Sequence, residues 1–88
     1  MLKNNLKKYR TKVFRKNNLP LTKTEFAQII KVSVQQYLRY ENGGTVPSLE
    51  VGLNISKNLR NKAEEDMIDS LKSITIEDIW FIVPDDDE

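Results

Sequence analysis

The sequence predicts an all-α domain, and three observations carry that prediction. Apolar residues recur at helical spacing, Ser or Thr stands before them at cap positions, and Gly or Pro follows them. Strand patterns are weak, because no Asn-Gly pair lies between alternating apolar runs. A chain of 88 residues holds material for one core. We therefore expect a single domain over residues 1–83 and an acidic, disordered tail at residues 84–88.

Two short helices joined by a tight turn are the most distinctive expected feature. Thr22 and Glu25 are spaced as a capping box that begins the first of them. Residues 31–32 make a tight connection, and Ser33 caps a second helix over residues 34–42. Gly43 and Gly44 end that helix. A helix-turn-helix requires this arrangement.

Four further helices are expected around this pair. The first helix is expected to end before Pro20. Its apolar residues recur at steps of three and four; they are Leu2, Leu6, Tyr9 and Val13. The others are expected over residues 49–59, 61–71 and 76–83, with Ser48 and Thr75 as caps and Pro84 as the stop.

Composition excludes several classes of function. Without Cys or His the chain lacks the common nucleophile, general base and metal ligands, and it has no glycine-rich phosphate loop. We therefore expect no enzyme activity, no catalytic residue, no metal and no cofactor. No apolar stretch is long enough for a membrane span, so the expected location is cytoplasmic and no membrane partner is expected.

Charge is divided unevenly between the two halves of the chain. Residues 1–40 hold ten Lys/Arg and one Glu, a net +9, whereas residues 41–88 hold four Lys/Arg and twelve Asp/Glu, a net −8. Such asymmetry indicates one side suited to a polyanion. In the second helix of the pair, Tyr37 and Tyr40 are expected to face the core. Gln35 and Arg39 lie one turn apart and face away from them.

Several segments resemble one known family. LTKTEFA at residues 21–27, Val32-Ser33, YENG at residues 40–43 and PSL at residues 47–49 resemble the Cro/Xre (lambda-repressor-like) helix-turn-helix family. ITIEDI at residues 74–79 is similar to the closing helix of that family. The resemblance implies a bundle of five helices, here with an extra helix inserted before the last by residues 60–73. It also implies a transcriptional regulator that binds double-stranded operator DNA, usually as a homodimer.

The resemblance assigns roles by position. The base-facing residues would be Val34, Gln35, Gln36 and Arg39. Lys23 and Asn42 would hold phosphates, and Arg15 would form a structural ion pair with Glu41, with Arg10 as the alternative partner. The chemistry suits these roles, since Gln pairs with adenine and Arg with guanine in the major groove.

The sequence departs from the family pattern at several positions, and two of these departures keep a second function open. Lys31 stands at a turn position that is often Gly, and Leu38 stands where a polar residue is usual. Leu38 and the inserted helix favour a protein-interaction module, such as an antitoxin, an antirepressor or a phage or plasmid regulatory adaptor. The apolar run of Trp80, Phe81 and Ile82 indicates either core packing or a dimer interface.

Overall fold

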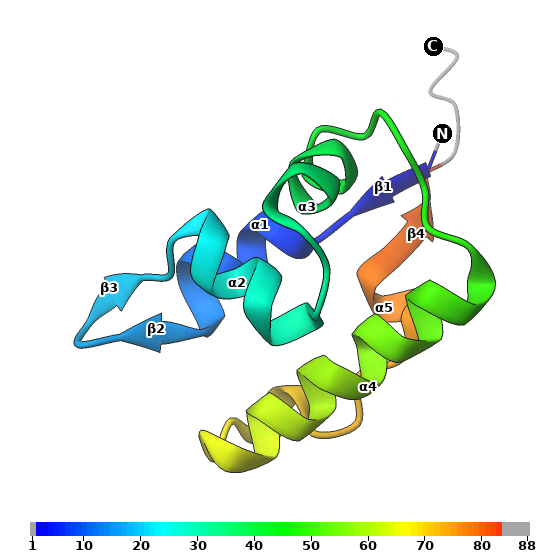
Figure 1. The fold of residues 1–88 in the computed structure, drawn as a ribbon. Helices are drawn as coiled ribbons and strands as arrows, with labels where there is room; N and C mark the ends of the chain where they lie inside the picture. The colour runs from blue at the N-terminus through cyan, green and yellow to red at the C-terminus, as the bar shows by residue number, and fades with distance from the viewer. Residues whose placement is uncertain (1, 84–88) are drawn as a thin grey trace, which may run out of the picture.

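The computed structural model describes residues 2–83 and has a mostly helical fold with a small strand component (Figure 1). The expected tail at residues 84–88 lies outside the described residues. The helices are α1 (Leu6–Lys8), which continues as a π-helical turn (Tyr9–Val13), α2 (Lys23–Ile30), α3 (Val34–Glu41), α4 (Leu49–Glu65), a 3-10 turn (Asp69–Leu71) and α5 (Ile76–Ile79). The strands are β1 (Leu2–Asn4), β2 (Arg15–Lys16), β3 (Leu19–Pro20) and β4 (Trp80–Ile82).

One apolar core joins the helices. At its centre the ring of Phe26 in α2 lies 6.3 Å from Phe14 and 5.3 Å from Tyr37 of α3, measured between ring centroids. From α4, Ile55 and Leu59 complete this layer, and both are fully buried. The long helix α4 thus closes the side of the helix pair that faces inward (Figure 1).

The two ends of the described chain form a sheet that the sequence did not predict. Strands β1 and β4 pair antiparallel, with Leu2 opposite Ile82 and Asn4 opposite Trp80. The first helix begins only at Leu6, because the Asn4 side-chain oxygen accepts the backbone N–H of Leu6 at 3.1 Å. The expected placement of Leu2 on that helix is therefore wrong. At the other end, α5 stops at Ile79 instead of continuing to residue 83.

A second small sheet replaces the expected helix end near Pro20. Strands β2 and β3 form an antiparallel hairpin with Lys16 opposite Leu19. The two residues between them, Asn17 and Asn18, have φ angles of 53° and 65°. Two consecutive left-handed residues make the type I′ turn that fits the twist of a two-residue hairpin, and Asn tolerates that region better than most residues.

The separate inserted helix predicted for residues 61–71 is wrong. Helix α4 runs without interruption to Glu65, because Leu59 and Ala63 continue its buried face. Met67 then adopts a left-handed conformation with φ 59°, and the N–H of Ile68 bonds back to the carbonyl of Ala63 at 2.7 Å. Only the short 3-10 turn follows before α5.

Candidate nucleic-acid interface

The turn between α2 and α3 is closed by local hydrogen bonds. Thr22 and Glu25 form the expected capping box, with both reciprocal bonds between 3.0 and 3.1 Å. Lys31 takes the left-handed conformation (φ 61°, ψ 43°) that ends α2, and the Val32 N–H then bonds to the Ala27 carbonyl at 3.0 Å. Lys31 thus adopts a left-handed conformation that Gly would adopt at lower cost.

Helix α3 turns one face to the core and leaves the other open. Ser33 caps it as expected, its side-chain oxygen accepting the N–H of Gln36 at 3.1 Å. Tyr37 and Tyr40 are buried, as expected. Gln35 and Arg39 are exposed and lie one turn apart on the open face. This face can offer amide and guanidinium donors to a flat or grooved polyanion.

The other predicted contact residues differ in how far their side chains are exposed. Gln36 is half-exposed, and Val34 is half-buried and packs against the core. Lys23 is exposed at the first residue of α2, and Asn42 is exposed at the C-cap of α3. Leu38, which had favoured a protein partner, also packs partly against the core.

The predicted ion pair between Arg15 and Glu41 is wrong, and Arg10 takes that place. Arg10 Nη2 lies 3.3 Å from Glu41 Oε1, and the two side chains are only 10% and 9% exposed. The same guanidinium donates to the Leu21 carbonyl at 3.1 Å and to the Tyr37 hydroxyl at 3.0 Å. Arg15 is exposed instead and donates to the Asn18 carbonyl at 2.6 Å. The π-helical turn directs Arg10 inward between α3 and the chain entering α2.

Tyr37 closes this buried network by donating its hydroxyl hydrogen to Glu41. Burial raises the pKa of Tyr37 well above its ordinary value of 10.0, and the hydrogen bond to the Glu41 carboxylate raises that pKa further. Tyr37 therefore holds its proton over the whole neutral range. Each guanidinium nitrogen and the Tyr37 hydroxyl thus has an acceptor, and a buried charge requires such partners.

The sequence predicts Arg10 only as the alternative partner of Glu41, although a periodic signal for it exists. Arg10 lies four residues after Leu6 and four before Phe14, both of which are fully buried. A cation at that spacing between two core residues is expected to face inward. The hydroxyl of Tyr37 was also missed as a polar partner, since Tyr37 was assigned to the core alone.

The C-terminal apolar run divides between core and surface. Trp80 is buried, and its ring meets that of Tyr40 edge-on at 6.3 Å between centroids. Phe81 is half-buried, whereas Ile82 is 78% exposed. Ile82 faces Leu2 across the β1–β4 sheet, and Leu2 is 42% exposed. Trp80 therefore serves the fold, while Ile82 is available for contact.

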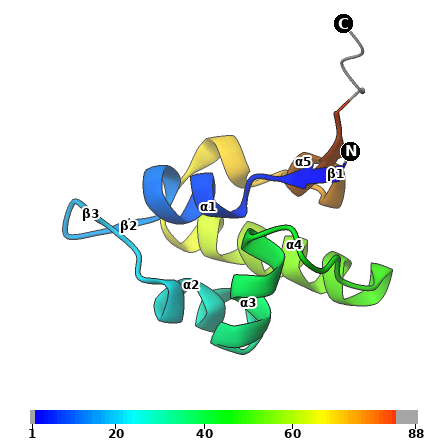
Figure 2. The same cartoon turned by 90° about the horizontal axis from the view of Figure 1, so that it is seen from above.

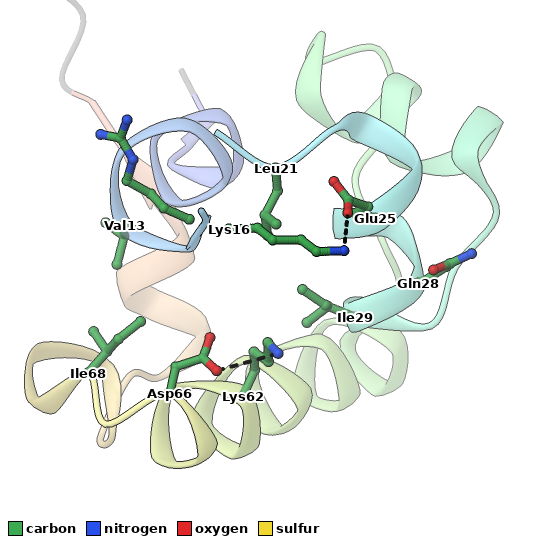
Figure 3. A pocket seen from close by; sticks show the side chains of 10 residues that line it. Val13, Lys16, Leu21, Glu25, Gln28, Ile29, Lys62, Asp66 and Ile68 are labelled. Carbon is green, nitrogen blue, oxygen red and sulfur yellow. Dashed lines mark hydrogen bonds and ion pairs between the residues drawn. The ribbon is translucent and has the colours of Figure 1, made fainter. Parts of the chain in front are cut away.

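An open hollow lies beside α2, between the hairpin and the C-terminal half of α4 (Figure 3). Its apolar floor includes Leu21 and Ile29. On its walls, Lys16 reaches Glu25 at 3.4 Å, and Lys62 reaches Asp66 at 3.4 Å. Lys16 and Lys62 are therefore paired with acids, and we assign no ligand to this hollow.

Residues 2–83 show neither a metal site nor a membrane-spanning helix. No group of His, Cys, Asp or Glu in that range is arranged to hold a metal ion. None of the helices described there combines the length and the apolar character needed to cross a bilayer.

A capped helix, a tight left-handed turn and a second capped helix with an open polar face define a helix-turn-helix protein. A family model described as helix-turn-helix matches residues 12–65, more than half of the chain. The chain therefore belongs to the Cro/Xre helix-turn-helix family. No curated protein and no solved structure matches it. The family is one of DNA-binding regulators and is generally non-enzymatic.

Proposed function

We propose that this chain is a transcriptional regulator that binds double-stranded DNA sequence-specifically, with α3 in the major groove. The observation that carries the proposal is the open face of α3, where Gln35 and Arg39 stand side by side. The major groove is wide enough to admit a helix, and these two side chains match the edges of adenine and guanine. No part of residues 2–83 covers this face in the single chain.

The proposed roles of the neighbouring residues follow from their positions. Lys23 and the first N–H groups of α2 suit phosphate oxygens, because a helix N-terminus carries partial positive charge. Asn42 at the end of α3 supplies a second phosphate contact. Gln36 supports base reading from the edge of the face, and Val34 reaches a thymine methyl only with the part of its side chain that the core leaves open.

We further propose that the regulator acts as a homodimer, through the exposed pair of Leu2 and Ile82. Operator sites are often two-fold, and a symmetric pair of chains places two copies of α3 in successive major grooves. The two residues face each other at the outer end of the β1–β4 sheet. They form an apolar pair of the kind that a second copy would cover.

The experiment that tests the proposal is selection of bound duplexes from a randomised DNA library, using the full chain. We expect an enriched consensus, bound more tightly than random duplex, and loss of that preference in the variant Gln35→Ala/Arg39→Ala. Lys57→Gln/Lys72→Gln, which removes two exposed cations elsewhere, is the control and should keep the preference.

The alternative is a protein-interaction module with the same fold. Two features had favoured it, and both are weaker in the structure: Leu38 packs against the core, and the inserted helix is an extension of α4. A chain that enriches no duplex, even at low salt, would return the alternative to first place.

A further inference from the structure

The β2–β3 hairpin carries positive charge that has no role in the DNA contacts proposed for the helix-turn-helix. Arg15 and Lys16 form strand β2, and every residue from 15 to 20 is exposed. Lys12 before the hairpin and Lys23 after it are exposed cations as well. The first acidic residue of the whole chain is Glu25, so the hairpin itself contains no acidic residue that would offset this positive charge.

The hairpin lies beside the end of α2 that would face the DNA backbone. Strand β3 ends at Pro20 and α2 begins at Lys23, so the base of the hairpin adjoins the N-terminus of α2. In both views the hairpin projects beyond the helices at one end of the molecule (Figures 1 and 2). A duplex held by α3 and by the N-terminus of α2 therefore has the hairpin at its flank.

Hydrogen bonds fix the hairpin relative to α3. The Leu21 N–H bonds to the Arg10 carbonyl at 3.1 Å, and the Arg10 guanidinium donates to the Leu21 carbonyl at 3.1 Å. That guanidinium is the one paired with Glu41 of α3. At the other edge, Lys16 pairs with Glu25 of α2, as Figure 3 shows. The hairpin is thus attached to both helices of the motif.

The side chains at the hairpin suit phosphate. Arg15 uses one N–H for the Asn18 carbonyl, which orients the guanidinium and leaves its other donors free for further partners. A guanidinium can bind a phosphate with two parallel hydrogen bonds. Lys16 is 67% exposed at its side chain despite its contact with Glu25. Asn17 and Asn18 keep the turn narrow, so the hairpin can lie along a groove edge.

We propose that the β2–β3 hairpin is a basic wing that binds backbone phosphates of the duplex next to the base pairs read by α3, through Arg15 and Lys16. This inference rests on the proposed function. Its second candidate partner, an acidic protein surface, is less favoured, because the hairpin adjoins the phosphate-binding end of α2 and not a surface remote from it.

The test measures DNA affinity against salt for Arg15→Gln/Lys16→Gln and for the control Lys57→Gln/Lys72→Gln, which has the same change in charge. Each phosphate contact contributes about 0.9 to the slope of log affinity against log salt. We expect the hairpin variant to lose roughly 1–2 from that slope and to bind about tenfold more weakly at low salt. The control should keep the wild-type slope, and Arg15→Lys/Lys16→Arg should retain it too.

Two duplexes that carry the selected consensus separate the wing from α3, one with flanking base pairs on both sides and one trimmed to the consensus itself. Wild-type chain should prefer the long duplex, and the hairpin variant should bind both alike. Equal slopes for hairpin and control variants would overturn the wing while leaving the proposed function intact. Absence of any DNA binding by the wild type would overturn both. A third outcome would assign the hairpin to an acidic protein: the wild type and the control variant bind polyglutamate, the hairpin variant does not, and all three bind DNA alike.

Discussion

Arg10 and Glu41 form a buried ion pair, 3.3 Å between Nη2 and Oε1, that joins the first helical segment to the end of α3. Both side chains are about nine-tenths buried. The same guanidinium also holds the chain that leads from the hairpin into α2. One cation therefore sets the relative position of the first helical segment, α3 and the chain that enters α2.

Removing one partner of this pair should destabilise the chain strongly. Glu41→Ala leaves the Arg10 guanidinium buried without its counter-charge, which costs about 3–5 kcal/mol. We expect this loss in the free energy of unfolding measured by urea denaturation. Asp69→Ala, which breaks the exposed pair with Lys72, is the control and should cost less than about 1 kcal/mol.

The double variant Arg10→Met/Glu41→Leu extends this test. Replacing a buried pair with apolar residues of similar volume is often near neutral, so its loss should be smaller than the sum of the single losses. If Glu41→Ala instead unfolds no more easily than Asp69→Ala, Arg10 and Glu41 do not form a buried pair in solution.

Tyr37 should make the fold sensitive to alkali. Because burial and the Glu41 carboxylate raise the pKa of Tyr37, the folded chain keeps this proton after the unfolded chain has lost it. The stabilisation is complete below the ordinary pKa of 10.0 and declines as the pH rises above it. We expect the urea midpoint to fall above about pH 10.

Tyr37→Phe should be less stable at neutral pH but should show a shallower decline above about pH 10. Tyr9, whose pKa burial also raises, contributes in the same direction, so Tyr9→Phe serves as the comparison. A decline as steep in Tyr37→Phe as in the wild type would show that Tyr37 titrates alike in the folded and unfolded chain.

Lys31→Gly should stabilise the turn between α2 and α3. Lys31 holds φ 61°, where a residue with Cβ is disfavoured by about 1–2 kcal/mol, while Gly adds some freedom to the unfolded chain. The expected net gain is about 0.5–1 kcal/mol in the free energy of unfolding. Lys31→Ala, which keeps the Cβ and removes the charge, should give no gain. A lower stability for the glycine variant would contradict the left-handed turn.

Local signals in the sequence predicted the helix-turn-helix correctly. The Thr22/Glu25 capping box and the Ser33 cap act within three or four residues, so their hydrogen bonds depend little on the rest of the fold. The burial of Tyr37 and the exposure of Gln35 follow from helical spacing alone. These elements form the candidate site, which is why the exposure of Gln35 and Arg39 could be predicted, whereas Val34 is half-buried against the core.

Contacts between distant segments were not predictable in the same way. Strand β1 pairs with β4, so nearly the whole chain separates the two partners, and no local pattern encodes that register. The resemblance predicts Arg15 as the partner of Glu41, whereas the π-helical turn places Arg10 on the buried face, at four-residue spacing from Leu6 and Phe14. Asn17 and Asn18 did carry a local hairpin signal, but the adjacent Pro20 favoured a helix end instead.

Arg39 and Lys23 should affect DNA binding in different ways. Arg39→Ala removes a donor pair for guanine and should reduce discrimination between consensus and mutated duplexes by about 1–3 kcal/mol. Lys23→Ala should weaken all duplexes alike and lower the salt slope by about 1. Competition binding across a set of single-base variants of the selected consensus measures both. Equal losses on every duplex from both substitutions would remove the base-reading role of Arg39.

Ile82→Lys should separate association from folding. Ile82 is 78% exposed, so a charge there costs the single chain little, but it would place two like charges at the interface of a symmetric dimer. Sedimentation equilibrium should show a dimer for the wild type and for Ile82→Val, and a monomer for Ile82→Lys. Thermal unfolding at low protein concentration should be nearly unchanged. Trp80→Ala, by contrast, should lower stability by about 3–5 kcal/mol, since Trp80 packs on Tyr40 in the core. A wild-type chain that stays monomeric at high concentration, or an Ile82→Lys variant that still associates, would rule out this end of the β1–β4 sheet as the dimer contact.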